Sequence, residues 1–180
     1  MPLDINYDTV KITITHSSNH PVHFLLGGGF SEEQGKYIRA GFILDGFRSP
    51  FGVEKFGKNY IINIEKPNKI DNVAYNQWVQ ITQIEKLFQQ FSEAETNKHY
   101  QFRQLIKDKQ FKPSIKDNSS FNPLLRTKPT PTFRVLKGGK STDETLQKQL
   151  GCFRVVLGSV WINDVNYGLN WLLQEVDMKL

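Results

Sequence analysis

The sequence has little cysteine and no long apolar run, and each absence narrows what the protein can be. Cys152 is the single cysteine among 180 residues, so the chain cannot form an internal disulfide or build a zinc site unaided. No apolar stretch approaches the roughly 18 residues that a membrane-spanning helix needs. The N-terminal residues lack the basic and apolar regions of a signal peptide. We therefore expect an intracellular protein that makes no contact with membranes.

Acidic residues are scarce in one part of the chain. The whole sequence carries 23 Lys and Arg residues and 18 Asp and Glu residues, a net charge of +5. Residues 98–140 contain eleven basic residues and only two acidic ones, Asp108 and Asp117, so this segment carries +9 and the remainder −4. The same segment holds five aromatic residues and four prolines. It predicts a long, extended, loop-rich basic segment.

Short strand signals dominate the rest of the sequence. Residues 10–15 alternate between apolar and polar side chains, and residues 22–26 form a short apolar run after a turn cluster, so together they predict a hairpin. Residues 37–44, closed by Asp45 and Gly46, and residues 60–65 are further candidates. Residues 152–161 and 167–176, on either side of 163–166, predict a second antiparallel hairpin.

One helix interrupts this pattern. Between about residues 73 and 91, Ile81, Ile84, Phe88 and Phe91 recur at steps of three and four, as one apolar face of a helix requires. Asp71 or Asn72 stands where an N-cap belongs. The elements predict one mainly β (α+β) domain over residues 1–180, with a helical insertion at 71–95 and the basic segment at 98–140.

Basic and aromatic residues interleaved in one segment are typical of proteins that bind single-stranded nucleic acid. Lysine and arginine neutralise phosphates and release condensed counterions. Exposed bases can stack on aromatic side chains, at about 1–3 kcal/mol for each base. The alternative interpretation is a solvated basic loop whose aromatic residues point into the core.

The motifs that would indicate an enzyme are incomplete. Residues 139–142, Gly-Lys-Ser-Thr, look like the end of a phosphate-binding loop, but Arg134 stands where the motif needs its first glycine. A glycine turn before a short helix is the better interpretation. Asp177 and Lys179, with Asp164 upstream, formally match a metal-dependent nuclease, but they lie in a hairpin turn and at the end of the sequence.

The histidines do not form a metal-binding motif either. His16, His20 and His23 have a spacing that converges on a metal only within a helix, and Pro21 breaks any helix there. We expect these side chains at an exposed hairpin tip. The histidine spacing therefore gives only weak support to a metal site.

Several short motifs resemble the single-stranded-DNA-binding proteins of large DNA viruses and phages. The resemblance covers about residues 38–176 and rests on the order of its segments. These are Pro50-Phe51-Gly52-Val53 before residues 60–64 and the amphipathic helix, Asn122-Pro123-Leu124-Leu125-Arg126 before residues 133–135, and the closing pair at 161–163 and 167–171.

The resemblance implies a fold and a set of binding residues. Those proteins carry an OB-like Greek-key barrel whose groove binds single strands. By position, one connecting loop and the start of the basic strand would contact nucleic acid. The predicted nucleic-acid-binding residues are Phe51, Lys55, Phe56, Lys58, Phe111, Lys112, Arg126, Lys128, Arg134 and Trp161.

The implied function is sequence-independent coating of single-stranded DNA during replication or recombination, by a protein that is not an enzyme and uses no cofactor or metal. Self-association on DNA and action at a site of viral DNA replication, in the host nucleus or cytoplasm, would accompany that role. The sequence ends without the acidic tail that many such proteins use to recruit partners. RNA binding, a structural or interaction role in a virion, and metal-dependent nuclease activity are the alternatives that experiments must separate.

Overall fold

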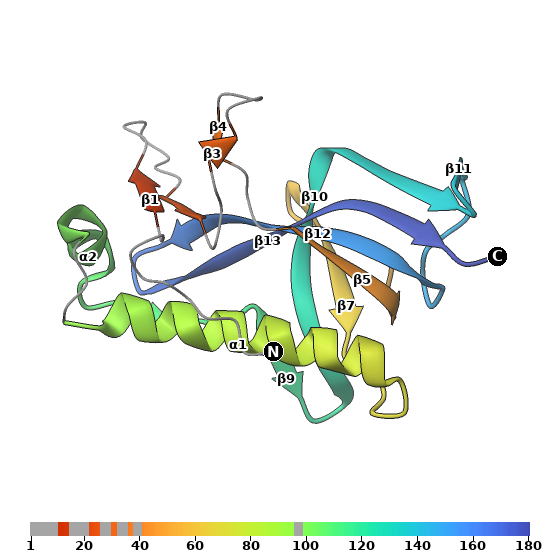
Figure 1. The fold of residues 1–180 in the computed structure, drawn as a ribbon, viewed down its shortest axis with the longest axis horizontal. Helices are drawn as coiled ribbons and strands as arrows, with labels where there is room; N and C mark the ends of the chain where they lie inside the picture. The colour runs from red at the N-terminus through yellow and green to blue at the C-terminus, as the bar shows by residue number, and fades with distance from the viewer. Residues whose placement is uncertain (1–10, 15–21, 26–29, 32–35, 38–40, 96–98) are drawn as a thin grey trace. The chain divides into compact units, whose positions relative to one another are not determined.

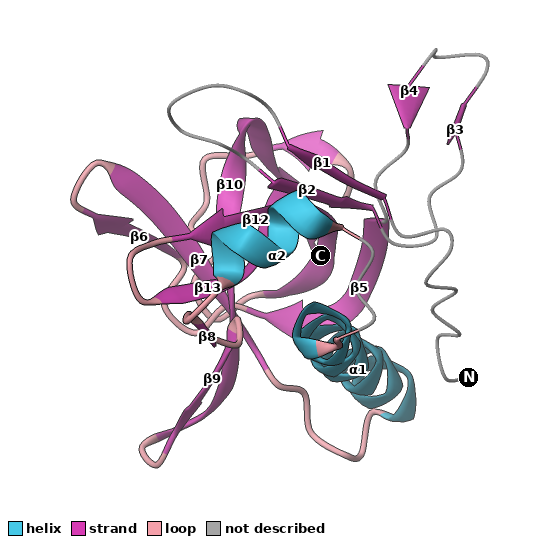
Figure 2. Ribbon diagram, turned by 90° about the vertical axis from the view of Figure 1, so that its left-hand side faces the viewer, coloured by secondary structure: helices cyan, strands magenta, loops and turns pink. Residues whose placement is uncertain are grey.

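The computed structural model describes residues 11–14, 22–25, 30–31, 36–37, 41–95 and 99–180, and it is mainly β with two helices (Figures 1 and 2). The helices are α1 (Asn72–Glu93) and α2 (Tyr100–Ile106). The mainly β class with an inserted amphipathic helix is thereby confirmed.

The chain divides into two compact units: unit 1 comprises residues 1–40, 80–113 and 157–170, and unit 2 comprises residues 41–79, 114–156 and 171–180. The expectation of a single domain stays a prediction.

Unit 2 is built on a sheet in the order β5-β12-β13-β10-β7-β6. Its strands are β5 (Gly41–Arg48), β6 (Val53–Phe56), β7 (Asn59–Glu65), β9 (Ile115–Asn118), β10 (Phe121–Lys137), β11 (Lys140–Ser141), the first part of β12 (Leu150–Ile162) and the second part of β13 (Asn166–Met178). Strand β10 runs parallel to β13 and antiparallel to β7, β9 and β11. Strand β10 therefore pairs with four other strands of this unit.

The loop-rich character expected for residues 98–140 is wrong. This segment forms α2, β8 (Gln110–Phe111), β9 and the 17-residue β10, which bends strongly in Figure 1. Proline lacks an N–H for a strand ladder, so it is tolerated where pairing is interrupted. The β10–β13 register shifts between Pro129 and Arg134, where Pro131 also lies, and the β10–β9 register shifts across Pro123. The prolines therefore mark irregularities within one strand.

The strand expected at residues 37–44 lies further along the chain. Tyr37 belongs to β4 (Lys36–Tyr37), residues 38–40 lie outside the described residues, and β5 runs through Asp45 and Gly46 to Arg48. Opposite β5, Gly151 pairs with Phe47 and Cys152 pairs with Asp45, so Gly46 is an extra residue in the ladder. Its φ of +79° is the left-handed conformation that glycine adopts at a bulge. The Asp-Gly pair therefore makes a bulge, where the sequence predicted an end.

Helix α1 confirms the predicted helix. The Asp71 side chain accepts a hydrogen bond from the Ala74 N–H at 3.1 Å, so Asp71 is the N-cap residue. Ile81, Ile84 and Phe88 are fully buried, as their three- and four-residue spacing requires. Within the described residues, neither helix is both long enough and apolar enough to cross a membrane.

Unit 1 contains a core of packed aromatic side chains. Its strands are β1 (Lys11–Ile14) and β2 (Val22–Leu25), which form the predicted hairpin, β3 (Phe30–Ser31) with β4, β8, and the adjoining parts of β12 and β13. Phe88 packs against the rings of Phe102, Phe111 and Tyr167, with centroids 5.8–6.3 Å apart. The Tyr167 hydroxyl forms a buried 2.7 Å hydrogen bond with Ser92. These contacts join α1, α2, β8 and β13.

Of two predictions made for turns, one is confirmed and the other is wrong. The predicted hairpin at 163–166 is confirmed, because the Asn163 side-chain oxygen accepts hydrogen bonds from the N–H groups of Val165 and Asn166. The short helix expected after residues 139–142 is absent from residues 142–149, which the structure describes in full. Gly139 instead turns β10 into β11. Of the three histidines expected at a hairpin tip, His16 and His20 lie outside the described residues.

Candidate nucleic-acid interface

The β6–β7 hairpin carries apolar side chains that its unit leaves exposed. Gly57 supplies a positive φ of +60° at the first position of the two-residue turn between the strands, as a type II′ turn requires. Around this turn Phe56 is 62% exposed and Tyr60 is 49% exposed. Large exposed aromatic residues that cluster at one place indicate a binding surface. Figure 2 shows this hairpin at the side of the unit.

Strand register places the predicted residues Phe56, Arg126 and Lys128 on one side of the sheet. Arg126 lies opposite Asn63 on β7, and Phe56 on β6 lies opposite Asn59. Because side chains alternate along a strand, every second residue shares a side. We call this side the β6–β7–β10 face, formed by Glu54, Phe56, Ile61, Asn63, Leu124, Arg126 and Lys128.

The opposite side of β7 and β10 is the core of unit 2. Thr127 pairs with Ile62, and Leu125 pairs with Ile64. All four side chains are buried, and the Thr127 hydroxyl donates a 2.7 Å hydrogen bond to the Ile62 carbonyl. The alternation of strand β10 therefore fixes Arg126 and Lys128 on the outside, because a slip of one residue would bury both charges.

The Phe56 and Arg126 side chains contact each other across the face. The Arg126 guanidinium lies over the Phe56 ring, 5.7 Å from its centroid, and Lys55 lies 6.0 Å from the centroid of Tyr60. A cation over an aromatic ring is stabilised by about 0.5–1 kcal/mol at an exposed site. The arrangement keeps the Arg126 charge beside an aromatic ring that is 62% exposed.

Five exposed cations lie on the strands and the turn near this contact, and of these Lys55 is on the other side of β6 from Phe56. Within the part of the chain that the structure describes, none of them forms an ion pair. Two flank the β6–β7 turn, one is on β9 opposite Leu124, and two are on β10. They are Lys55, Lys58, Lys116, Arg126 and Lys128.

Phe51, another predicted residue, packs edge-on against Phe121. Their ring centroids are 5.4 Å apart with an interplanar angle of 87°. Phe121 is half exposed and begins β10, five residues before Arg126. The pair therefore adds a second aromatic surface to the strand that carries the basic residues.

Arg134 is placed differently from the other basic residues of β10. Its Nε donates to the Glu175 carboxylate at 2.5 Å, and it lies beyond the register shift in this strand. Its side chain is 65% exposed, but its charge is matched by a neighbour on β13. Arg134 therefore has less charge to offer to a phosphate than Lys128.

The remaining three predicted residues lie in unit 1. Phe111 packs against Phe88 and Tyr167, so much of its ring serves that aromatic core. The Lys112 N–H donates to the Tyr167 carbonyl, and its side chain is exposed. Trp161 lies half buried against Gly168, where a side chain would meet both the Trp161 ring and the Lys112 carbonyl. The structure thus brings Lys112 and Trp161 together at Gly168, and their binding role stays a prediction.

Sequence reasoning missed three residues of the interface. Tyr60 and Lys116 were not among the predicted binding residues, and Phe121 was noted only as part of the basic segment. The turn at Gly57 was a usable signal, because a two-residue turn there pairs Lys55 with Tyr60. Lys116 could not be found in the same way, because its pairing with Leu124 depends on an irregular register.

The residues considered for a nuclease have other contacts. The Asp177 carboxylate accepts a 3.0 Å hydrogen bond from the Gly139 N–H, and Lys179 lies 3.4 Å from Asp45. Asp164 is exposed in the β12–β13 turn. Among the residues with described positions, no group of three or more histidine, cysteine or acidic residues is arranged to hold a metal ion.

No protein-family model and no curated protein matches the sequence. The structure is similar to the crystal structure of gp2.5, a single-stranded DNA binding protein encoded by bacteriophage T7, with a TM-score of 0.50. The two chains are 12% identical, and the match covers 79% of this chain and 87% of the gp2.5 chain. A likeness at this level of identity concerns the fold. The chain therefore has a mainly β fold similar to that of a phage single-stranded DNA binding protein.

Proposed function

We propose that this protein binds single-stranded DNA independently of base sequence and coats single strands during replication or recombination. The observation that carries the proposal is the exposed Phe56 ring in contact with Arg126, on a face that also carries Lys116 and Lys128, neither of which has an ion-pair partner among the described residues. Binding of this kind needs stacking surfaces and phosphate contacts and no catalytic group. The β6–β7–β10 face offers both.

The two kinds of side chain have separate physical roles. Lys55, Lys58, Lys116, Arg126 and Lys128 would neutralise phosphates and release counterions, so affinity would fall steeply with salt. Phe56 would stack on a base, and stacking tolerates any base because every base has a π-face. Single strands expose that π-face, whereas a duplex hides it. The face should therefore prefer single strands to duplexes.

The fold comparison supports the same proposal. The similar structure is described as a single-stranded DNA binding protein from a phage, and the fold match covers most of both chains. An OB-like groove binds single strands on a curved sheet, and the bend of β10 supports a surface of this kind (Figure 1). We place the coating role inside the cell at sites of DNA replication, with self-association along the strand as part of it.

A titration tests the proposal directly. A labelled strand of about 30 nucleotides, followed by fluorescence anisotropy at low and moderate salt, should bind tightly with a strongly negative salt slope. At about 0.7 for each phosphate contact, five cations predict a slope near −3.5 on a log–log plot. Duplex DNA should compete poorly. An RNA strand of the same sequence tests sugar preference, because only contacts to the 2′-OH distinguish the two.

A matched pair of variants links binding to the face. Phe56→Ala should weaken binding by about 5-fold to 150-fold, the equivalent of 1–3 kcal/mol of lost stacking. Tyr100→Ala removes an equally exposed aromatic residue from α2 and should leave binding unchanged. Equal losses in both variants, or no binding by the unmodified protein at low salt, would sink the proposal.

A further inference from the structure

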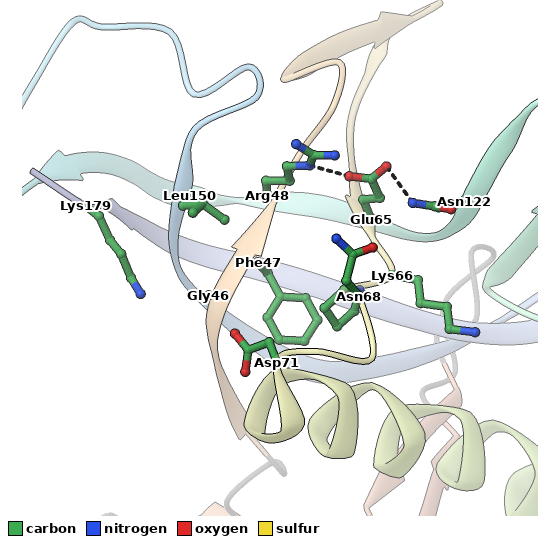
Figure 3. Close-up of a pocket in the computed structure, with 11 residues that line it drawn as sticks. Gly46, Phe47, Arg48, Glu65, Lys66, Asn68, Asp71, Asn122, Leu150 and Lys179 are labelled. Carbon is green, nitrogen blue, oxygen red and sulfur yellow. Dashed lines mark hydrogen bonds and ion pairs between the residues drawn. The ribbon is translucent and has the colours of Figure 1, made fainter.

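A cavity of about 320 Å³ lies in unit 2 beside the first residues of β10. Its walls come from β5, the end of β7, the loop that leads to α1, β10 and β12 (Figure 3). Small-molecule sites begin at about 300 Å³, so this volume suits one small planar group. The cavity is separate from the Phe56–Arg126 contact, and nothing in the proposed function uses it so far.

One wall of the cavity carries the Glu65 carboxylate, whose charge is neutralised by Arg48. The Glu65 carboxylate accepts hydrogen bonds from Arg48 Nε and, at 3.2 Å, from the Asn122 side-chain nitrogen. Both of its oxygens are thus engaged, as the dashed lines in Figure 3 show. The wall therefore does not repel an anion as a free carboxylate would. The terminal nitrogens of Arg48 remain as donors, because only its Nε has a partner within the described residues.

The second feature is a pair of amides with unused hydrogen-bonding capacity. The Asn68 side chain has no hydrogen bond within the described part of the chain, and Figure 3 shows it between Phe47 and Glu65. The Asn122 side-chain oxygen likewise has no donor there. An amide offers donors and an acceptor together, which is what the edge of a nucleobase requires. Half-exposed Leu150 adds an apolar surface for the face of a base.

The cavity is continuous with the proposed binding strand. Asn122 and Arg126 are four residues apart on β10, at most about 13 Å along an extended strand. A second hollow of about 440 Å³ shares Glu65 and Asn122 with the cavity and is also lined by Phe121. A single strand of DNA that contacts Arg126 can therefore also contact Phe121 and Asn122 without leaving this unit.

We propose that this cavity receives one base of the bound single strand, with the Asn68 and Asn122 amides at its edge and the Arg48 guanidinium at the adjoining phosphate. The inference rests on the proposed function, since it gives that function a subsite for a base. Because an amide can present its donor or its acceptor, such a subsite is compatible with coating of any sequence. It predicts that a strand without bases cannot use the cavity.

The test compares two strands of about 12 nucleotides, one of thymidines and one of abasic units with the same phosphates. Asn68→Ala should bind the thymidine strand about threefold to tenfold more weakly, the loss expected for one neutral hydrogen bond. It should bind the abasic strand as well as the unmodified protein does. Leu150→Trp, which fills the cavity, should show the same selective loss. Asn76→Ala, an exposed asparagine of α1 outside the cavity, is the matched control.

A spectrum of the unmodified protein gives an independent readout. The side-chain amide signals of Asn68 should shift in a ¹⁵N correlation spectrum when the thymidine strand is added, and stay in place with the abasic strand. If the thymidine strand binds but neither variant loses affinity and the Asn68 signals do not move, the subsite is overturned and the coating function stands. If neither strand binds the unmodified protein, the proposed function fails as well.

Discussion

Phe102 and Phe111 of unit 1 lie in a different environment from Phe121 of unit 2, although all three belong to residues 98–140. In unit 1, Phe102 is fully buried and Phe111 packs against Phe88 and Tyr167. In unit 2, Phe121 is half exposed on the strand that also presents Arg126 and Lys128. Both parts of the segment combine basic and aromatic residues. Whether an aromatic residue stabilises the fold or is available for a base is therefore decided by which side of its strand or helix faces the core.

The largest expected difference between the two environments is in stability. Phe88→Ala should lower the free energy of unfolding by about 3–5 kcal/mol, because it leaves a cavity among the rings of Phe102, Phe111 and Tyr167. Phe56→Ala, on the exposed hairpin, should lower it by at most about 1 kcal/mol, the contribution of the cation–π contact with Arg126. Denaturant unfolding of both variants measures this contrast. Similar losses for the two would mean that Phe56 belongs to the core.

Local patterns were sufficient for the elements whose residues interact with near neighbours. Helix α1 follows from the spacing of Ile81, Ile84 and Phe88, and β7 and the β12–β13 hairpin follow from alternation and a turn at Asn163. Strand β10 lies in the segment that was expected to be extended and loop-rich. Its prolines fall where its pairing with β9 and β13 is irregular, so they are compatible with one long strand.

The candidate site was predictable only in part. Phe56, Arg126 and Lys128 were named from the sequence, and the structure places them on one face. The neutralising contacts were not predictable, because Glu175 and Arg134 are 41 residues apart and Glu65 and Arg48 are 17 apart. Such partners depend on strand register, which a single sequence does not specify. The cavity at Asn68 and Asn122 depends on the same long-range packing.

A smaller effect separates the basic residues of β10 from one another. Glu175→Gln removes the counter-charge of Arg134, so it should raise the affinity for single strands by up to about fivefold and steepen the salt slope by about 0.7. Arg134→Ala and Lys128→Ala should each weaken binding, and the loss for either variant should not depend on base composition. The loss should be larger for Lys128→Ala. Anisotropy titrations over a range of salt measure all three variants. Unchanged affinity in Glu175→Gln would place Arg134 outside the phosphate path.

The smallest expected effect on DNA binding comes from modifying Cys152, which lies in the same unit as the β6–β7–β10 face. Burial, together with its hydrogen bond to the Asp45 carboxylate at 3.1 Å, raises the pKa of the Cys152 thiol to about 11. The same hydrogen bond and the nearby Lys179 hold the pKa of Asp45 below its usual value.

Because the thiolate is the reactive form, Cys152 in the folded protein should alkylate at pH 8 at least about tenfold more slowly than in the denatured chain. Asp45→Asn should make it faster by lowering the thiol pKa. The alkylated protein should bind single strands as the unmodified protein does, because Cys152 lies on β12, paired with β5, and outside the proposed interface. A loss of binding on alkylation would show that the binding surface extends along β12 beyond Leu150, as far as Cys152.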